Sequence, residues 1–408
     1  MSTDGASRVD VVLRPGPRPI ASAARSTNLD IVRAVAALLV LTGHSYLLSG
    51  HYLNPTELRP DHLLITNMAA GVWLFFALSG FLIAAPYVDA LVAGRPLPGL
   101  RSYALRRAAR IYPLYIVAFL VAGLVAPVSP VTHWWQWPLH LALLHNLVPG
   151  EEQAILFASW TLTIEVLYYA AVPIAARAVR WMREGPIPGR TIVAGVIAVW
   201  VASTLFTGTA GLVQPHHIKI GLWLRFVFPA TVAMFCPGLI VAVAAAEDRH
   251  GSGPWRWWSS MRARPRPWLA AAIVLALVAC VLETRTNSVV YDLQRVPFAL
   301  ASGIAVAVAA ARPERRTVPA RVLARVGLVS YGIYLWQAVI LQIIMGRNLY
   351  HLVPWPHTGP LPFAAHVAYM LALVVPTAWI SWTFFERPIL HRVRRMVGRP
   401  ETGGPGPA

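Results

Sequence analysis

The chain has 408 residues, of which 57% are apolar and only 13% are charged. Soluble domains carry about a quarter charged residues, so the composition excludes an ordinary water-soluble enzyme and indicates a protein immersed in lipid. The net charge of +18 suits nucleic acid in principle, but so apolar a chain leaves little water-facing surface for a nucleic-acid groove. Its two cysteines, both in apolar runs, exclude a disulfide-rich module and a cysteine-based zinc site.

Apolar stretches long enough to cross a membrane recur along the chain. A helical span needs about 20 residues, and we expect about ten such spans, near residues 29–49, 68–88, 111–128, 158–178, 191–208, 222–246, 268–284, 292–311, 326–346 and 362–385. Lipid admits only helices or closed barrels, and these runs are too long for barrel strands. The sequence therefore predicts an all-α fold, a polytopic transmembrane helical bundle.

The distribution of basic residues predicts how the bundle is oriented. Of the 35 Lys and Arg residues, 28 lie in the two tails and in alternate connections, and six lie in the opposite connections. Such a bias marks the cytoplasmic side, so we expect both termini in the cytoplasm and an even number of spans. We divide the chain into a disordered cytoplasmic tail at 1–28, a transmembrane domain at 29–390 and a disordered cytoplasmic tail at 391–408.

The first predicted span carries Arg33 near its start and His44 near its outer end. Eleven helical residues make three turns plus about 20° and rise about 16 Å, so the two side chains share one face. Arg33 then lies near the cytoplasmic surface, and His44 lies in the outer half of the bilayer. Polar groups inside spans are costly and often functional. A snorkelling arginine and a hydrogen-bonded core histidine explain this helix alone equally well.

The cytoplasmic run from Arg101 to Pro113 places Arg107 and Arg110 three residues apart, so they share a face if the run is helical. Guanidinium groups bind phosphate through bidentate, charge-assisted bonds. Taken alone, the run is also a typical cytoplasmic anchor for the next span. Because Arg33 faces the same membrane side, we expect a phosphate-binding mouth below a polar channel that leads to His44.

The stretch 133–148 is rich in Trp and His, and we expect it to be interfacial or re-entrant. Its histidines His133, His140 and His145 fit no zinc pattern, and we predict no metal site. Tryptophans at this level are typical of the membrane interface, although they could also stack on an acceptor sugar.

The fourth predicted span carries Glu165 about six residues, or about 10 Å, below the outer surface. His44 lies at a similar depth, and a carboxylate beside an imidazole is what general acid–base chemistry requires. A structural ion pair without chemistry is the alternative.

Six segments in order resemble the acyltransferase-3 family of bacterial integral-membrane O-acyltransferases over about residues 29–390. They are Leu29 to His44, Gly71 to Ile83, Arg107 to Pro113, Ser159 to Glu165, Ser330 to Trp336 and Phe385 to Pro388. The resemblance implies about ten transmembrane helices, a multi-pass location in the bacterial cytoplasmic membrane, a cytoplasmic acyl-CoA donor and a carbohydrate or glycosylated acceptor. It implies no permanently bound cofactor, with acetyl-CoA as the default co-substrate.

The motifs of this family fall on residues already singled out. Its Arg-x10-His, Ser-Gly-Phe and Arg-x-x-Arg motifs match Arg33 with His44, Ser79 with Gly80 and Phe81, and Arg107 with Arg110. By this resemblance His44 is catalytic. Many relatives carry a histidine after the Tyr-Leu-Trp of the ninth span, where this chain has Gln337, which leaves His44 as the expected sole base.

These residues predict O-acylation of a sugar hydroxyl. We expect the acyl-CoA phosphates to bind Arg33, Arg106, Arg107 and Arg110, with His44 as general base and Glu165 supporting the imidazolium. Ser79 could donate to the carbonyl oxygen, or the small Ser79–Gly80 pair could let helices or substrate approach closely. Tyr331, Tyr334 and Trp336 are expected to line the donor path or the acceptor site, with helix packing as the alternative.

A polytopic transporter or flippase is the competing interpretation, in which Arg33, His44 and Glu165 form a substrate or proton pathway. It explains the arginine cluster less well, and the sequence shows no duplicated halves. We expect as partners the lipid bilayer, acyl-CoA and a sugar-containing acceptor, without nucleic acid. The sequence does not specify the acceptor, the acyl length, an acyl-enzyme intermediate or the oligomeric state.

Overall fold

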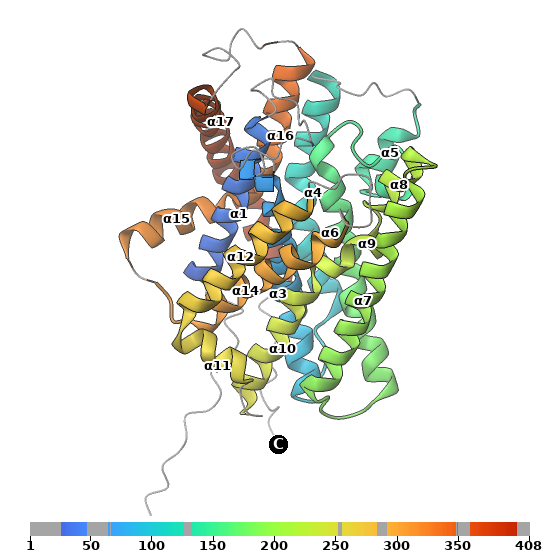
Figure 1. The fold of residues 1–408 in the computed structure, drawn as a ribbon, viewed down its shortest axis with the longest axis vertical. Helices are drawn as coiled ribbons and strands as arrows, with labels where there is room; N and C mark the ends of the chain where they lie inside the picture. Colours follow the sequence, from blue (N-terminus) through green and yellow to red (C-terminus); the bar gives the residue numbers. More distant parts are fainter. Residues whose placement is uncertain are drawn as a thin grey trace, which may run out of the picture.

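The computed structural model describes residues 26–46, 64–65, 67–125, 133–251, 255–283, 292–315, 317–347, 349 and 360–397. These residues form an all-helical bundle without strands, and most helices run along its long axis (Figure 1). The predicted all-α class is therefore confirmed. Most of both predicted tails, residues 1–25 and 398–408, lies outside the described residues.

The long helices occupy the predicted apolar stretches. In chain order they are α1 (Thr27–Ser45), α3 (Gly71–Val92), α4 (Leu100–Val125), α6 (Trp160–Met182), α7 (Gly189–Val213), α10 (Cys236–His250), α12 (Pro265–Glu283), α14 (Arg295–Ala311), α16 (Ser330–Gly346) and α17 (Pro360–Ser381). Shorter helices join them: α5 (Gln136–Leu141), α8 (Ile218–Leu224), α9 (Phe228–Thr231), α11 (Arg256–Ala263), α15 (Val318–Leu328) and α18 (Arg387–Val397). Four 3-10 turns and one π-helical turn complete the described chain: Met68–Ala70, His145–Leu147, Phe157–Ser159, Val232–Met234 and Trp382–Glu386.

Six helices among the described residues are long and apolar enough to cross a membrane, or eight if each of two bent pairs forms one span. The bent pairs are Phe228–Met234 with Cys236–His250, at 44°, and α15 with α16, at 58°. The other two predicted spans coincide with α1, which begins with polar residues, and with α14, which has 17 residues. The chain is a multi-pass membrane protein, whereas ten spans and cytoplasmic termini stay predictions.

Two helices extend further than the sequence suggested. The predicted third span began at residue 111, but α4 begins at Leu100 and includes the whole arginine run. At the other end, α18 continues to Val397, into the segment expected to be a disordered tail. Its Ile389, Leu390 and Val393 are half-buried while its arginines are exposed. An amphipathic face packed on α4 thus explains helix where composition suggested disorder.

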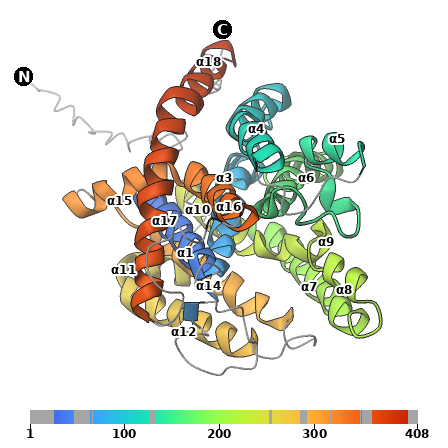
Figure 2. The same cartoon turned by 90° about the horizontal axis from the view of Figure 1, so that it is seen from above.

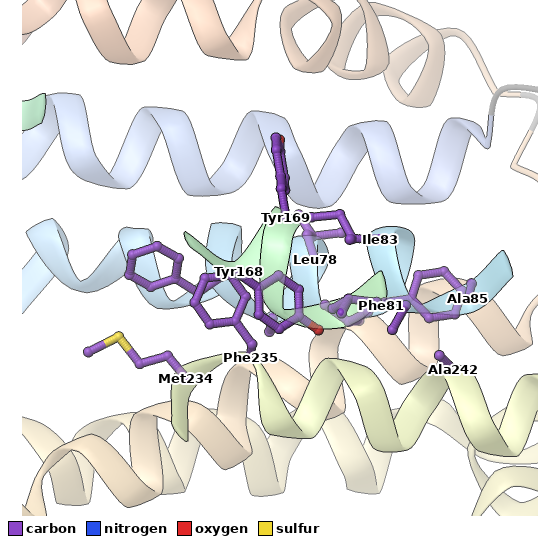
Figure 3. Packing of buried hydrophobic residues seen from close by; sticks show 14 of the residues in the cluster. Leu78, Phe81, Ile83, Ala85, Tyr168, Tyr169, Met234, Phe235 and Ala242 are labelled. Carbon is purple, nitrogen blue, oxygen red and sulfur yellow. The ribbon is translucent and has the colours of Figure 1, made fainter. Parts of the chain in front are cut away.

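The centre of the bundle is the close packing of α3 against α10. A Cβ atom at Gly80 would lie 2.2 Å from the Phe235 carbonyl oxygen, and one at Gly238 would lie 1.8 Å from the Ala77 carbonyl oxygen. Backbones approach this closely only where both side chains are absent. Tyr168 of α6 stacks on Phe235 beside this contact, at 4.0 Å between ring centroids (Figure 3). Seen from above, α1, α3 and α16 lie near the middle, with α7 and α8 at the periphery (Figure 2).

Candidate functional site

A cavity of about 130 Å³ lies between α1, α3, α4, α6 and α16. Its walls combine cationic, hydroxyl and aromatic groups. The polar and aromatic lining consists of Arg33, Phe75, Phe76, Ser79, Arg107, Arg110, Thr161, Glu165, Tyr169, Ser330, Tyr331 and Tyr334. Three of these helices, α1, α4 and α6, thus bring charged groups together inside an apolar bundle.

Three guanidinium groups and one carboxylate line this cavity. Arg33 is ion-paired with the buried Asp30, one helical turn earlier on α1. Arg107 and Arg110 have no salt bridge to a carboxylate within the described part of the chain. Because Asp30 neutralises Arg33, two guanidinium charges, at Arg107 and Arg110, remain against the Glu165 carboxylate, and the lining keeps a positive excess. Such a cavity favours an anionic ligand.

Aromatic rings hold the two arginines of α4. The Arg107 guanidinium lies over the rings of Tyr103 and Tyr169, at 5.5 and 5.3 Å from the centroids. Arg110 lies over Tyr331 at 5.5 Å and over Trp382 at 5.9 Å. Stacking fixes a guanidinium through its face and leaves the N–H groups at its edge available for oxygen ligands.

Glu165 is held from two sides by hydroxyl groups. Ser79 on α3 donates a hydrogen bond to its Oε1 atom at 2.9 Å, and Tyr169 donates to the same atom at 2.8 Å. Tyr169 follows Glu165 by one helical turn on α6 and points away from the Tyr168–Phe235 stack (Figure 3). The carboxylate is therefore fixed on the cavity wall beside the arginines.

His44 lies outside this lining and has different neighbours. Its Nδ1 atom is 2.9 Å from Oε1 of Gln337 on α16, and its ring meets Phe157 edge-on at 5.2 Å between centroids. Gln337 also donates from Nε2 to the Tyr334 carbonyl oxygen at 3.1 Å. The Tyr334 hydroxyl lies 2.8 Å from the Thr161 hydroxyl, and both residues line the cavity. His44 is thereby linked to the cavity wall through α16.

The structure brings together seven of the predicted site residues. Arg33, Ser79, Arg107, Arg110, Glu165, Tyr331 and Tyr334 all line the cavity. The expected Glu165–His44 pair is not formed, because α3 packs between α1 and α6 and each side chain binds a different partner. Similar predicted depths on two helices do not make their side chains lateral neighbours.

The other predicted site residues lie outside the cavity lining. Phe81 belongs to the hydrophobic cluster packed against α10 (Figure 3). Gly80 meets the backbone of Phe235 there, so its small size serves the close approach of two helices. The Arg106 guanidinium donates to the Ser102 hydroxyl on its own helix. Trp336 packs against the hydrophobic clusters, and its buried indole N–H has no hydrogen-bond partner among the described residues.

Sequence reasoning missed Asp30, Thr161 and Tyr169 as parts of this site. A signal existed for two of them, since Asp30 precedes Arg33 and Tyr169 follows Glu165 by one helical turn. The Gln337 contact with His44 joins residues 293 positions apart, and a single sequence contains no signal for it.

The loop before α6 contains a second polar cluster, which is closed. His140 and His145 are 0% exposed and stack at 4.3 Å between ring centroids. His140 bonds Glu151 at 3.1 Å, and His145 bonds Ser159 at 3.1 Å. Burial, with the nearby His140 ring, lowers the pKa of His145 to about 3. Burial also lowers the pKa of His140, although its hydrogen bond to Glu151 opposes this. His140 and His145 are core residues with no exposed surface.

Comparisons with known proteins identify one family and two relatives that match over most of the chain. The family model described as acyltransferase domain matches residues 26–386. The chain is 25% identical over 413 aligned residues to "Acyltransferase MdmB" of Streptomyces mycarofaciens, covering 94% of this chain and 96% of that protein. It is 23% identical over 408 residues to "Nodulation protein 10" of Rhizobium leguminosarum bv. viciae, covering 94% and 98%. No solved structure matches the chain significantly.

Proposed function

The chain belongs to the acyltransferase-3 family, whose model it matches over residues 26–386, and from this premise we propose that it is an O-acetyltransferase of the bacterial cytoplasmic membrane. In this proposal it transfers the acyl group of cytoplasmic acyl-CoA to a hydroxyl of a carbohydrate or glycosylated acceptor. The observation that carries the proposal is the cavity whose wall holds Arg107 and Arg110, which form no salt bridge among the described residues, with Glu165 as the carboxylate in the lining. Acyl-CoA is a co-substrate of suitable chemistry, because its diphosphate needs fixed cationic donors.

The separation of the charged groups supports a donor that spans the bundle. Arg33 and His44 are on one continuous helix, α1, so about 16 Å separates them along the axis. An extended pantetheine arm has a comparable length. With its phosphates at Arg107 and Arg110, the donor would place its thioester toward the outer end of α1.

His44 is the group we assign to proton transfer. A histidine near neutral pH can accept the proton of an attacking hydroxyl. The oxygen of the acceptor then forms a bond to the acyl carbon, the carbon–sulfur bond breaks, and the proton passes to the departing CoA thiolate. Glu165 lies beside the arginines instead of beside His44, so we assign it, with Ser79, to shaping the donor cavity.

Thioester turnover tests the proposed function. The purified protein in lipid nanodiscs, given acetyl-CoA and membrane glycan extract, is expected to release free CoA and to label the acceptor. Arg107→Gln with Arg110→Gln should raise the KM for acetyl-CoA at least about tenfold, since each charge-assisted hydrogen bond contributes about 1.5–3 kcal/mol.

The control is Arg183→Gln, an exposed arginine beyond the end of α6, which should leave the KM unchanged. Equal KM values in the two variants would reduce Arg107 and Arg110 to topology anchors. A transporter or flippase would move substrate without releasing CoA, and absence of CoA release would overturn the proposed function itself.

A further inference from the structure

Among the described residues, Gln337 alone forms a hydrogen bond with the His44 ring. The Gln337 side chain is 0% exposed, whereas His44 keeps part of its surface exposed. The contact joins Oε1 of the glutamine to Nδ1 of the imidazole at 2.9 Å. Gln337 thus holds Nδ1 of His44 from inside the bundle, and no described residue bonds Nε2.

The second contact of Gln337 fixes which way its amide faces. Its Nε2 atom donates to the Tyr334 carbonyl oxygen at 3.1 Å. If the amide were flipped, its oxygen would face this carbonyl oxygen, and two acceptors would be buried against each other. The helix backbone of α16 therefore directs the amide oxygen toward His44.

An amide oxygen can only accept, so the proton of a neutral His44 must sit on Nδ1. The lone pair of the imidazole is then on Nε2, the nitrogen that no described residue bonds. Protonation at Nε2 leaves the Nδ1–H···Oε1 bond in place, so the ring can take up and release a proton without any rearrangement of Gln337.

We infer that Gln337 is the positioning residue that holds His44 in the Nδ1–H tautomer and presents Nε2 to the acceptor hydroxyl. This inference rests on the proposed function. Nε2 takes the hydroxyl proton as the oxygen–acyl bond forms, and the same proton leaves on the CoA thiol as the carbon–sulfur bond breaks. Gln337 exchanges no proton; its oxygen stabilises the positive charge on the ring during the step.

The first test removes the acceptor and keeps the volume. Gln337→Met should lower kcat about 10- to 100-fold, the cost seen when a group that orients a metal-bound histidine is lost. Its KM for acetyl-CoA should change less than about twofold, because Gln337 does not line the cavity.

Gln342 provides a matched control. It is also buried on α16 and donates to a backbone carbonyl, that of Ile155, at 2.9 Å. Gln342→Met loses the same kind of hydrogen bond and should keep kcat within about threefold. If the two variants had equal kcat values, the inference would be overturned.

A second variant retains the acceptor and adds charge. A carboxylate in Gln337→Glu also accepts from Nδ1–H, and it stabilises the imidazolium. Because the base acts only when deprotonated, the acidic limb of the pH–kcat profile should move up by about one pH unit. A packing role alone would leave the limb in place. This readout is available even if Gln337→Met folds poorly.

Nitrogen-15 NMR of histidine-labelled protein locates the proton directly. The signal that disappears in His44→Gln is expected to carry its proton on Nδ1, and a proton on Nε2 would contradict the inference. Full activity in His44→Ala would overturn the proposed base. Loss of activity in His44→Ala with normal activity in Gln337→Met would remove this inference alone.

Discussion

The described residues of the bundle include two histidine sites, and they differ in how far their rings are exposed. His140 and His145 are fully buried, stacked on each other and bonded to Glu151 and Ser159. His44 is partly exposed and is bonded at Nδ1, on the side that faces Gln337. Each site contains a ring nitrogen without a hydrogen-bond partner among the described residues, Nδ1 of His140 and Nε2 of His44. The His140 ring is 0% exposed, whereas the His44 ring belongs to a partly exposed residue. A free nitrogen on a histidine therefore indicates a proton-transfer role only where the ring can also be reached.

The largest expected effect separates the two sites by activity. His44→Ala should lower kcat at least about 100-fold, the usual contribution of a general base, with little change in melting temperature. His216→Ala, at an exposed position between α7 and α8, is the control and should retain full activity. Near-normal turnover in His44→Ala would make its ring as structural as that of His140.

The closed site should respond through stability. Glu151→Leu leaves the Gln136 amide and the His140 ring without their acceptor, which costs about 1–3 kcal/mol for each buried group. We expect a melting temperature lower by several degrees and an unchanged kcat at a temperature where the variant is folded. Glu151→Gln retains an acceptor and should lose less. A selective loss of kcat in Glu151→Leu would place this cluster in the reaction.

Acid should weaken the closed site as well. Burial lowers the pKa of His145 from 6.5 in the unfolded chain to about 3 in the folded protein. Below pH 6.5 the unfolded chain therefore binds a proton that the folded chain excludes. Stability then falls as pH falls from 6.5 toward 3, by up to about 1.4 kcal/mol per pH unit. Melting temperatures at pH 7.5 and 5.5 measure this. The difference should shrink in His145→Gln and persist in His216→Gln.

The smallest effect concerns the cavity. Ser79→Ala removes one hydrogen bond to Glu165, worth about 1 kcal/mol, and should lower kcat/KM about fivefold. Ser302→Ala, at a buried serine of α14, is the control. A loss of 100-fold or more in Ser79→Ala would instead indicate a direct role in stabilising the thioester oxygen.

The sequence indicated which polar groups belong to the site better than it indicated their neighbours. Arg33, Arg107 and Glu165 stood out as charged groups in or beside apolar runs, and all three line one cavity. Hydropathy and helical periodicity cannot show which helices touch. We therefore expected Glu165 to pair with His44, whereas in the structure it accepts a hydrogen bond from Ser79 on α3. The predicted start of α4 was wrong because its run of arginines has the composition of a loop. That run forms the first turns of the helix. Lateral contacts depend on packing between segments hundreds of residues apart, as for Gln337.

The absence of side chains at Gly80 and Gly238 has a consequence for how variants of this chain should be interpreted. Ser79 and Gly80 are adjacent on α3, so one faces the cavity while the other meets the backbone of Phe235. Any methyl group at position 80 must shift or rotate α3, and that rotation moves the Ser79 hydroxyl away from Glu165. A steric collision on one side of α3 would therefore be measured in an assay as a loss of turnover. An alanine scan would therefore mark Gly80 as catalytic although it touches no reactant.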